Sequence, residues 1–179
     1  MSVSREKPSR RLRRILPLAL LAAVEAAGVL SCSTDECLDN KNSLPLAGFY
    51  ASSPAPLPLR VDSLTVFGAG APGDTLLLDC GSASQLYLPF RIDQPETTFV
   101  FRYDNKAAAQ LGLEDVITFR YDIEPRFVSS ACGAVYLYKM REIESTNVLI
   151  DSVSCPDGVI DNTAAENIRI YFRYTDPDL

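Results

Sequence analysis

Five cysteines are the residues of this sequence with the most distinctive chemistry. A thiolate can be a nucleophile, a metal ligand or a disulfide partner, and Cys32 and Cys37 stand five positions apart where an apolar run ends. The chain contains no histidine, which excludes Ser-His-Asp and Cys-His catalysis and imidazole metal sites. We therefore expect the cysteines to serve in modification and crosslinking.

Carboxylates are the other candidates for chemistry. Four of them lie close together in the sequence: Asp151, Asp157, Asp161 and Glu166. Paired acids can hydrolyse glycosides, but Asp157-Gly158 and Asp161-Asn162 have the composition of turns. They also lack the alternating oxygen ligands of a calcium loop, and residues 68–74 lack the Gly-Lys-Ser/Thr ending of a phosphate loop. We expect no enzyme, no cofactor and no metal site.

Residues 1–31 have the composition of a signal peptide. Six basic side chains lie in residues 5–14, and a broken apolar stretch follows over residues 15–30, shorter than the roughly 20 apolar residues of a membrane-spanning helix. The end of the segment, Val29-Leu30-Ser31-Cys32, resembles the lipobox of bacterial lipoproteins. The resemblance implies that Cys32 is acylated and becomes the mature N-terminus. An ordinary secretory signal cleaved near residues 26–28 is one alternative, and a retained membrane anchor is another.

Removal of this segment changes the charge of the protein. Residues 32–179 comprise 148 residues with 11 basic and 21 acidic side chains, a net charge of −10. A domain of this charge without a basic stripe does not bind nucleic acid well. The length predicts one folded domain over residues 46–179, and the polar residues 33–45 predict a tether that joins it to the acylated Cys32.

Alternating apolar residues predict strands over most of the domain. The tetrapeptide Phe-Arg-Tyr-Asp occurs at residues 101–104 and 119–122, and Phe-Arg-Tyr-Thr occurs at residues 172–175. Because side chains alternate between the two faces of a strand, one set should be buried and the other solvated. The set predicted to be buried is Phe101, Phe119 and Phe172, and the solvated set is Arg102, Arg120 and Arg173.

The remaining elements are short. We expect strands at residues 64–67, 75–78 and 86–88, a hairpin made of residues 135–143 and 147–153, and at most two helical turns over residues 105–111 and one over residues 163–166. Strands at short spacing between Pro- and Gly-containing turns predict an all-β fold, an antiparallel β-sandwich of the immunoglobulin-like kind. A small β-barrel is the alternative.

Three segments resemble a family of small Bacteroidota lipoproteins of unknown function: residues 116–119, 128–133 and 167–172, the second containing Ala131-Cys132-Gly133. The resemblance implies no activity. It implies a disulfide between Cys37 and Cys132, which leaves Cys80 and Cys155 to pair by elimination. Ser33-Thr34-Asp35-Glu36 also resembles the acidic export signal of surface lipoproteins in that phylum, so Asp35 and Glu36 favour the cell surface over the periplasmic face of the outer membrane.

Two functions from different classes fit this sequence. One is an interaction or accessory subunit of an outer-membrane β-barrel protein or assembly complex, held at the membrane by its lipid. The other is a surface module that binds a glycan or another ligand through exposed tyrosine or phenylalanine. The chain has no tryptophan, and its aromatic residues alternate as core residues do, which favours the first.

Overall fold

The computed structural model of the protein describes residues 43–70, 75–129, 133–161, 163 and 165–173. The predicted signal peptide and residues 32–42 of the predicted tether lie outside this part. The described elements, in chain order, are β1 (Leu46–Ala51), β2 (Val61–Gly68), β3 (Leu76–Ala83), β4 (Gln85–Tyr87), β5 (Glu96–Tyr103), α2 (Lys106–Leu111), β6 (Glu114–Ser129), β7 (Gly133–Ser145), β8 (Ile150–Ser154), β9 (Val159–Ile160) and β10 (Glu166–Phe172).

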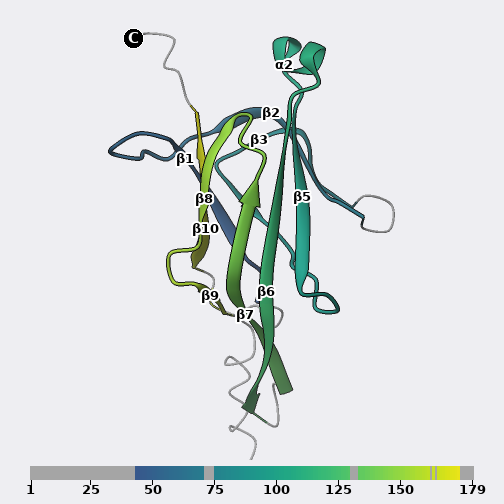
Figure 1. The fold of residues 1–179 in the computed structure, drawn as a ribbon, viewed down its shortest axis with the longest axis vertical. Helices are drawn as coiled ribbons and strands as arrows, with labels where there is room; N and C mark the ends of the chain where they lie inside the picture. Colours follow the sequence, from purple (N-terminus) through teal and green to yellow (C-terminus); the bar gives the residue numbers. More distant parts are fainter. Residues whose placement is uncertain (1–42, 71–74, 130–132, 162, 164, 174–179) are drawn as a thin grey trace, which may run out of the picture. The chain divides into compact units, whose positions relative to one another are not determined.

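The strands form two sheets, which confirms the predicted all-β fold (Figure 1). Four strands pair in the order β4-β1-β10-β8, and six pair in the order β3-β2-β5-β6-β7-β9. Apolar residues from both sheets form one buried cluster, so the sheets are two layers that share a core. The ring of Phe49 on β1 joins them, because it packs edge-on against Phe172 of β10 at 5.3 Å and Phe101 of β5 at 6.4 Å between centroids.

The alternation predicted for the repeated tetrapeptides is confirmed. Phe101, Phe119 and Phe172 are buried. Arg102 and Arg173 are exposed, and Arg120 is half-exposed. The face of each strand that looks toward the other sheet is therefore the apolar face.

Tyr103 and Tyr121 lie on the buried faces of β5 and β6, and the hydroxyl of each makes a hydrogen bond. Tyr103 donates to the Asp115 carboxylate at 2.8 Å, and Tyr121 donates to the Arg91 carbonyl at 2.8 Å. A buried tyrosine is tolerated where its hydroxyl finds such a partner.

Two details differ from the predicted arrangement. The sheet of four strands is not purely antiparallel, because β1 and β10 run parallel with Phe49 beside Ile170. Residues 135–143 and 147–153 do not form a hairpin either: β7 pairs with β6 and β9, whereas β8 pairs with β10 in the other sheet. Alternation marks a strand but does not say which strand lies beside it.

The ends of the described domain also refine the predictions. The short helix α2 is confirmed, with the Asn105 side chain accepting from the Ala108 amide at 2.9 Å. Glu166 begins β10, so the helical turn predicted there is wrong. Ser43 and Pro45 are buried, and the Pro45 carbonyl accepts from the Leu88 amide. The fold thus already includes the last residues of the predicted tether.

Candidate functional site: a projecting hairpin and a small cavity

The strands β6 and β7 continue past the end of their neighbours. The pairing of β5 with β6 stops at Glu96 and Arg120, whereas β6 continues to Ser129. On the other side, β9 pairs only with Tyr138 and Lys139 of β7. Residues 122–129 and 133–137 therefore form a two-stranded extension, which we call the projecting hairpin; Figure 1 shows the two strands running on side by side beyond β5.

One face of the projecting hairpin is apolar and open to solvent. Tyr121 and Ile123 of β6 face the core, and the next residues on the same face of β6 lie beyond the neighbouring strands. The register places Tyr138 and Tyr136 of β7 on this face as well. Within the projecting hairpin, this face consists of four exposed residues, which we call the apolar hairpin face: Pro125, Phe127, Ala134 and Tyr136. Phe127 is 70% exposed and Tyr136 is 36% exposed. No described strand of the four-stranded sheet pairs with this part of the hairpin.

The proline in this face affects how the hairpin can make contacts. Pro125 pairs with Tyr136 across the hairpin and has no backbone N–H. A proline within a strand lowers the tendency of the strand edge to accept a further strand. Contacts of the projecting hairpin should therefore be made by its side chains, with Phe127 the largest exposed apolar group. On the opposite face, Glu124 and Arg126 are exposed.

A buried carboxylate, Asp115, holds the opposite end of β6. Its Oδ1 accepts from the Val148 amide and the Thr146 hydroxyl, and its Oδ2 accepts from the amides of Leu149 and Ile150 at 2.8 and 2.9 Å. These bonds tie the turn after β7 to β6 and direct the chain into the other sheet, which explains why β7 and β8 do not pair.

The electrostatics of Asp115 fit a structural role. Burial would raise the pKa of Asp115, but hydrogen bonds from the amides of Ile150, Val148 and Leu149 and from the Tyr103 hydroxyl hold it below its usual value. The carboxylate is ionised and has no exposed surface. The same burial and the Asp115 charge raise the pKa of Tyr103. A perturbed pKa often marks an active site, but here no substrate can reach the carboxylate, so it positions the fold.

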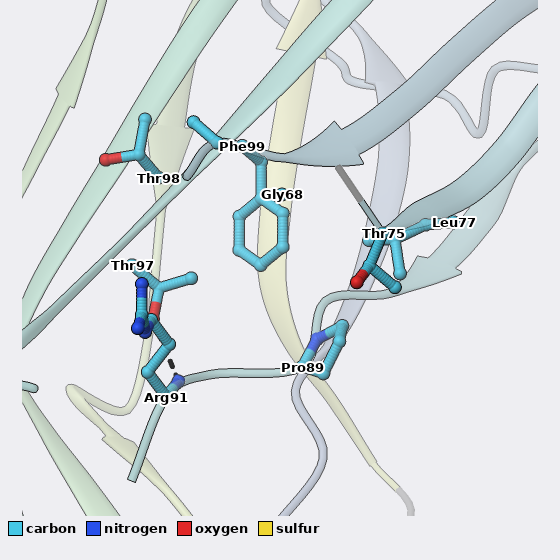
Figure 2. Close-up of a pocket in the computed structure, with 9 residues that line it drawn as sticks. Gly68, Thr75, Leu77, Pro89, Arg91, Thr97, Thr98 and Phe99 are labelled. Atoms are coloured by element: carbon cyan, nitrogen blue, oxygen red, sulfur yellow. Dashed lines mark hydrogen bonds between the residues drawn. The ribbon is translucent and has the colours of Figure 1, made fainter. Parts of the chain in front are cut away.

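A small cavity lies between β3, β5 and the segment after β4 (Figure 2). It has a volume of about 220 Å³ and is lined mainly by apolar groups. Figure 2 shows the Phe99 ring between Leu77 and Pro89 on one side and Arg91 beside Thr97 on the other. No pattern in the sequence indicated this cavity, because its lining comes from four short stretches of residues 68–99 that only the folded chain brings together: the end of β2, β3, the segment after β4 and β5.

The residues predicted for modification are only partly described. Cys32, Asp35, Glu36, Cys37 and Cys132 lie outside the described residues, so acylation, the export signal and the bond between Cys37 and Cys132 stay predictions.

Cys80 and Cys155 are described, and they are unpaired thiols. Cys80 lies on β3, the edge strand of the six-stranded sheet, between Leu78 and Gly81, which both pair with β2. Cys155 follows β8, an edge strand of the four-stranded sheet. β4 follows β3 after one residue and forms one edge of the four-stranded sheet, whereas β8 forms the other edge. Cys80, just before β4, and Cys155, just after β8, therefore lie toward opposite edges of that sheet. The pairing of Cys80 with Cys155, reached by elimination, is therefore not formed in this structure.

Three of the four neighbouring carboxylates have hydrogen-bond partners of their own. Asp151 accepts from the Ser52 hydroxyl at 2.6 Å, Asp161 accepts from the Thr163 amide at 3.0 Å, and Glu166 accepts from the Tyr50 hydroxyl at 2.9 Å. Among the described residues, no three acidic or cysteine side chains are grouped as metal ligands would be. No helix in the described part is long and apolar enough to cross a membrane.

One aromatic cluster was not predicted. Tyr50 and Tyr171, on neighbouring strands of the four-stranded sheet, have ring centroids 5.8 Å apart, and the Arg169 guanidinium lies over the Tyr50 ring. The Glu166 carboxylate sits against Gly48, where a Cβ would collide with it. The parallel pairing of β1 with β10 creates this cluster, and alternation alone could not have revealed it.

Comparison with known proteins identifies a family for the domain. The family of unknown function DUF6452 matches residues 63–172. The chain belongs to this family. The matched residues of DUF6452 run from β2 to the end of β10 and contain the projecting hairpin, whereas β1 lies before them. No curated protein and no solved structure matches the chain.

Proposed function

We propose that this protein is a non-catalytic, lipid-anchored protein of the outer membrane that binds a neighbouring membrane protein, an outer-membrane β-barrel or its assembly complex. The apolar hairpin face carries the proposal. The projecting hairpin exposes the aromatic side chains of Phe127 and Tyr136 to solvent. Exposed aromatic side chains of this kind often contribute much of the binding energy at protein–protein interfaces. The hairpin lies within the part of the chain that belongs to DUF6452.

The point where the chain enters the domain supports a membrane partner. The strand β9 pairs with β7 at the base of the projecting hairpin, and six residues after it ends β10 begins at Glu166, beside Leu46 of β1. The chain therefore enters the domain at the end from which the hairpin projects. Eleven peptide units separate Cys32 from Ser43, which limits that distance to about 36–40 Å. A lipid on Cys32 would keep the hairpin close to the membrane and raise its effective concentration toward proteins there.

A second candidate function rests on the cluster of Tyr50 and Tyr171. Aromatic rings beside a guanidinium and a carboxylate on the open face of a sheet are a setting in which a glycan could bind. The polar groups of this cluster already bind one another: Glu166 and Arg169 are 3.1 Å apart, and the Tyr50 hydroxyl donates to the same carboxylate. Glycan binding by the cluster is therefore less well supported than protein binding by the hairpin.

Photo-crosslinking in intact cells tests the preferred function. A photoreactive amino acid replaces Phe127 or Tyr136, and as a control it replaces Leu111 on α2, which is 73% exposed. We expect the two hairpin positions to capture one outer-membrane protein and Leu111 to capture none. Capture of soluble periplasmic proteins alone, or equal capture at all three positions, would contradict the proposal.

Two further measurements test the anchor and its address. Metabolic labelling with a fatty-acid analogue should mark the protein and leave Cys32→Ala unlabelled; label on that variant would refute acylation at Cys32. External protease should cleave the domain in intact cells if Asp35 and Glu36 direct it to the surface. Protection of the domain would place it on the periplasmic face.

A further inference from the structure

The cavity beside Arg91 has walls that are held in place without a ligand. On one side, the Arg91 amide donates to the Thr97 hydroxyl at 2.9 Å, and the Arg91 carbonyl accepts from the Tyr121 hydroxyl. The neighbouring Phe90 ring stacks on Tyr121 with centroids 4.7 Å apart. On the other side, Ala69 and Thr98 are joined by a backbone hydrogen bond. The space is therefore preformed, which lowers the cost of binding.

The size and lining of this cavity indicate the class of its ligand. Its volume of about 220 Å³ exceeds the roughly 150 Å³ that accommodates a benzene-sized molecule in an apolar cavity. Phe99, Leu77 and Pro89 supply apolar surface, and Arg91 supplies the charge. An apolar group of this size fits the space, and the guanidinium selects an anion.

The guanidinium of Arg91 is available to a ligand. Its described ion-pair partner is Asp93, at 3.5 Å from Nε, and the Asp93 side chain is largely exposed. An exposed ion pair of this length contributes little, and the two terminal nitrogens of a guanidinium can bind a carboxylate with two parallel hydrogen bonds.

We propose that the cavity binds a small organic carboxylate, with its aryl or branched-alkyl group against Phe99 and Leu77 and its carboxylate paired with Arg91. This inference is independent of the docking of the hairpin. The ligand class follows from the residues that line the cavity and not from the partner of the protein.

An NMR titration with 3-phenylpropionate tests the proposal. The sample is the whole chain carrying Cys32→Ala, which keeps acyl chains from absorbing the probe, with methyl labels on alanine and leucine. We expect saturable shifts at Ala69 and Leu77 and none at Leu59, near the other end of β2. The neutral 3-phenylpropanamide and the variant Arg91→Gln should each weaken binding by about tenfold or more, since a charged hydrogen-bonded partner is lost.

The matched control is Arg60→Gln. Arg60 also pairs with an aspartate two positions on, at 3.6 Å from Asp62, but it does not line the cavity. The Arg60→Gln variant should leave the affinity unchanged, whereas Ala69→Phe should fill the cavity and abolish the shift at Leu77. Absence of shifts up to the solubility limit of 3-phenylpropionate overturns the proposal. Equal binding of the amide, or equal losses in the Arg60 and Arg91 variants, overturns the assigned role of Arg91.

Discussion

The strands β6 and β7 behave differently in their two halves. Within the sandwich, Phe119, Tyr121 and Tyr138 face the other sheet and are buried. Beyond it, Phe127 and Tyr136 lie on the same face of the same strands and are exposed. The apolar pattern is continuous, but the covering layer is not. An apolar strand face thus predicts that something covers it, whether another part of the fold or a partner.

The largest expected effect comes from truncating the covered half. Phe119→Ala should lower the free energy of unfolding by about 3–5 kcal/mol, because it leaves a cavity in a packed core. Phe127→Ala, with the same change of side chain on the same strand face, should lower it by under about 0.5 kcal/mol, as for an exposed residue. Urea denaturation measures both values. Similar losses would show that Phe127 is packed within the protein and would remove the basis for a docking surface.

A smaller loss is expected at the anchored end of β6. Asp115→Asn replaces one acceptor oxygen by an NH₂ group that faces the donors of Tyr103, Leu149 and Ile150 or those of Val148 and Thr146. Leaving such donors unsatisfied should cost about 2–3 kcal/mol of unfolding free energy. Hydrogen exchange should show the opening of the turn after β7. A loss confined to global stability, with that turn still protected, would mean that Asp115 does not direct the crossing between sheets.

The stabilisation by Asp115 should depend on pH. Because its pKa is lower in the folded protein than in the unfolded chain, its contribution is fully present above the unfolded pKa of about 3.9 and is lost as the pH falls through the folded value. The difference in unfolding free energy between the wild type and Asp115→Asn should therefore shrink below about pH 4. A difference that stays constant across this range would show that the carboxylate has no depressed pKa.

The smallest effect concerns the solvated outer face of β6. Arg120 binds Glu96, Glu142 and Glu144 at 2.7–3.4 Å, all of them exposed. Arg120→Gln should cause a small loss of thermal stability that diminishes as salt is added, because exposed charges are screened. A loss that does not change with salt would indicate that the alkyl part of Arg120 packs on the sheet.

The sequence allowed the strands and their buried faces to be predicted, because alternation is a local property of the chain. Phe101, Phe119 and Phe172 were assigned to the core on this ground, and the composition of residues 105–111 indicated the short helix α2 equally locally. The lipid and disulfide roles of Cys32, Cys37 and Cys132 also come from the sequence, and they stay predictions.

Only the tertiary structure decided which strands are neighbours and which apolar face stays open. The crossing after β7 depends on Asp115, which lies some thirty residues away from the amides that it binds. The edges that separate Cys80 from Cys155 and the pair of Tyr50 and Tyr171 depend on contacts between distant segments. The cavity at Arg91 depends on how four short stretches of residues 68–99 pack together. Alternation determines which way a side chain points from its strand, but what it meets there depends on where the other strands are placed.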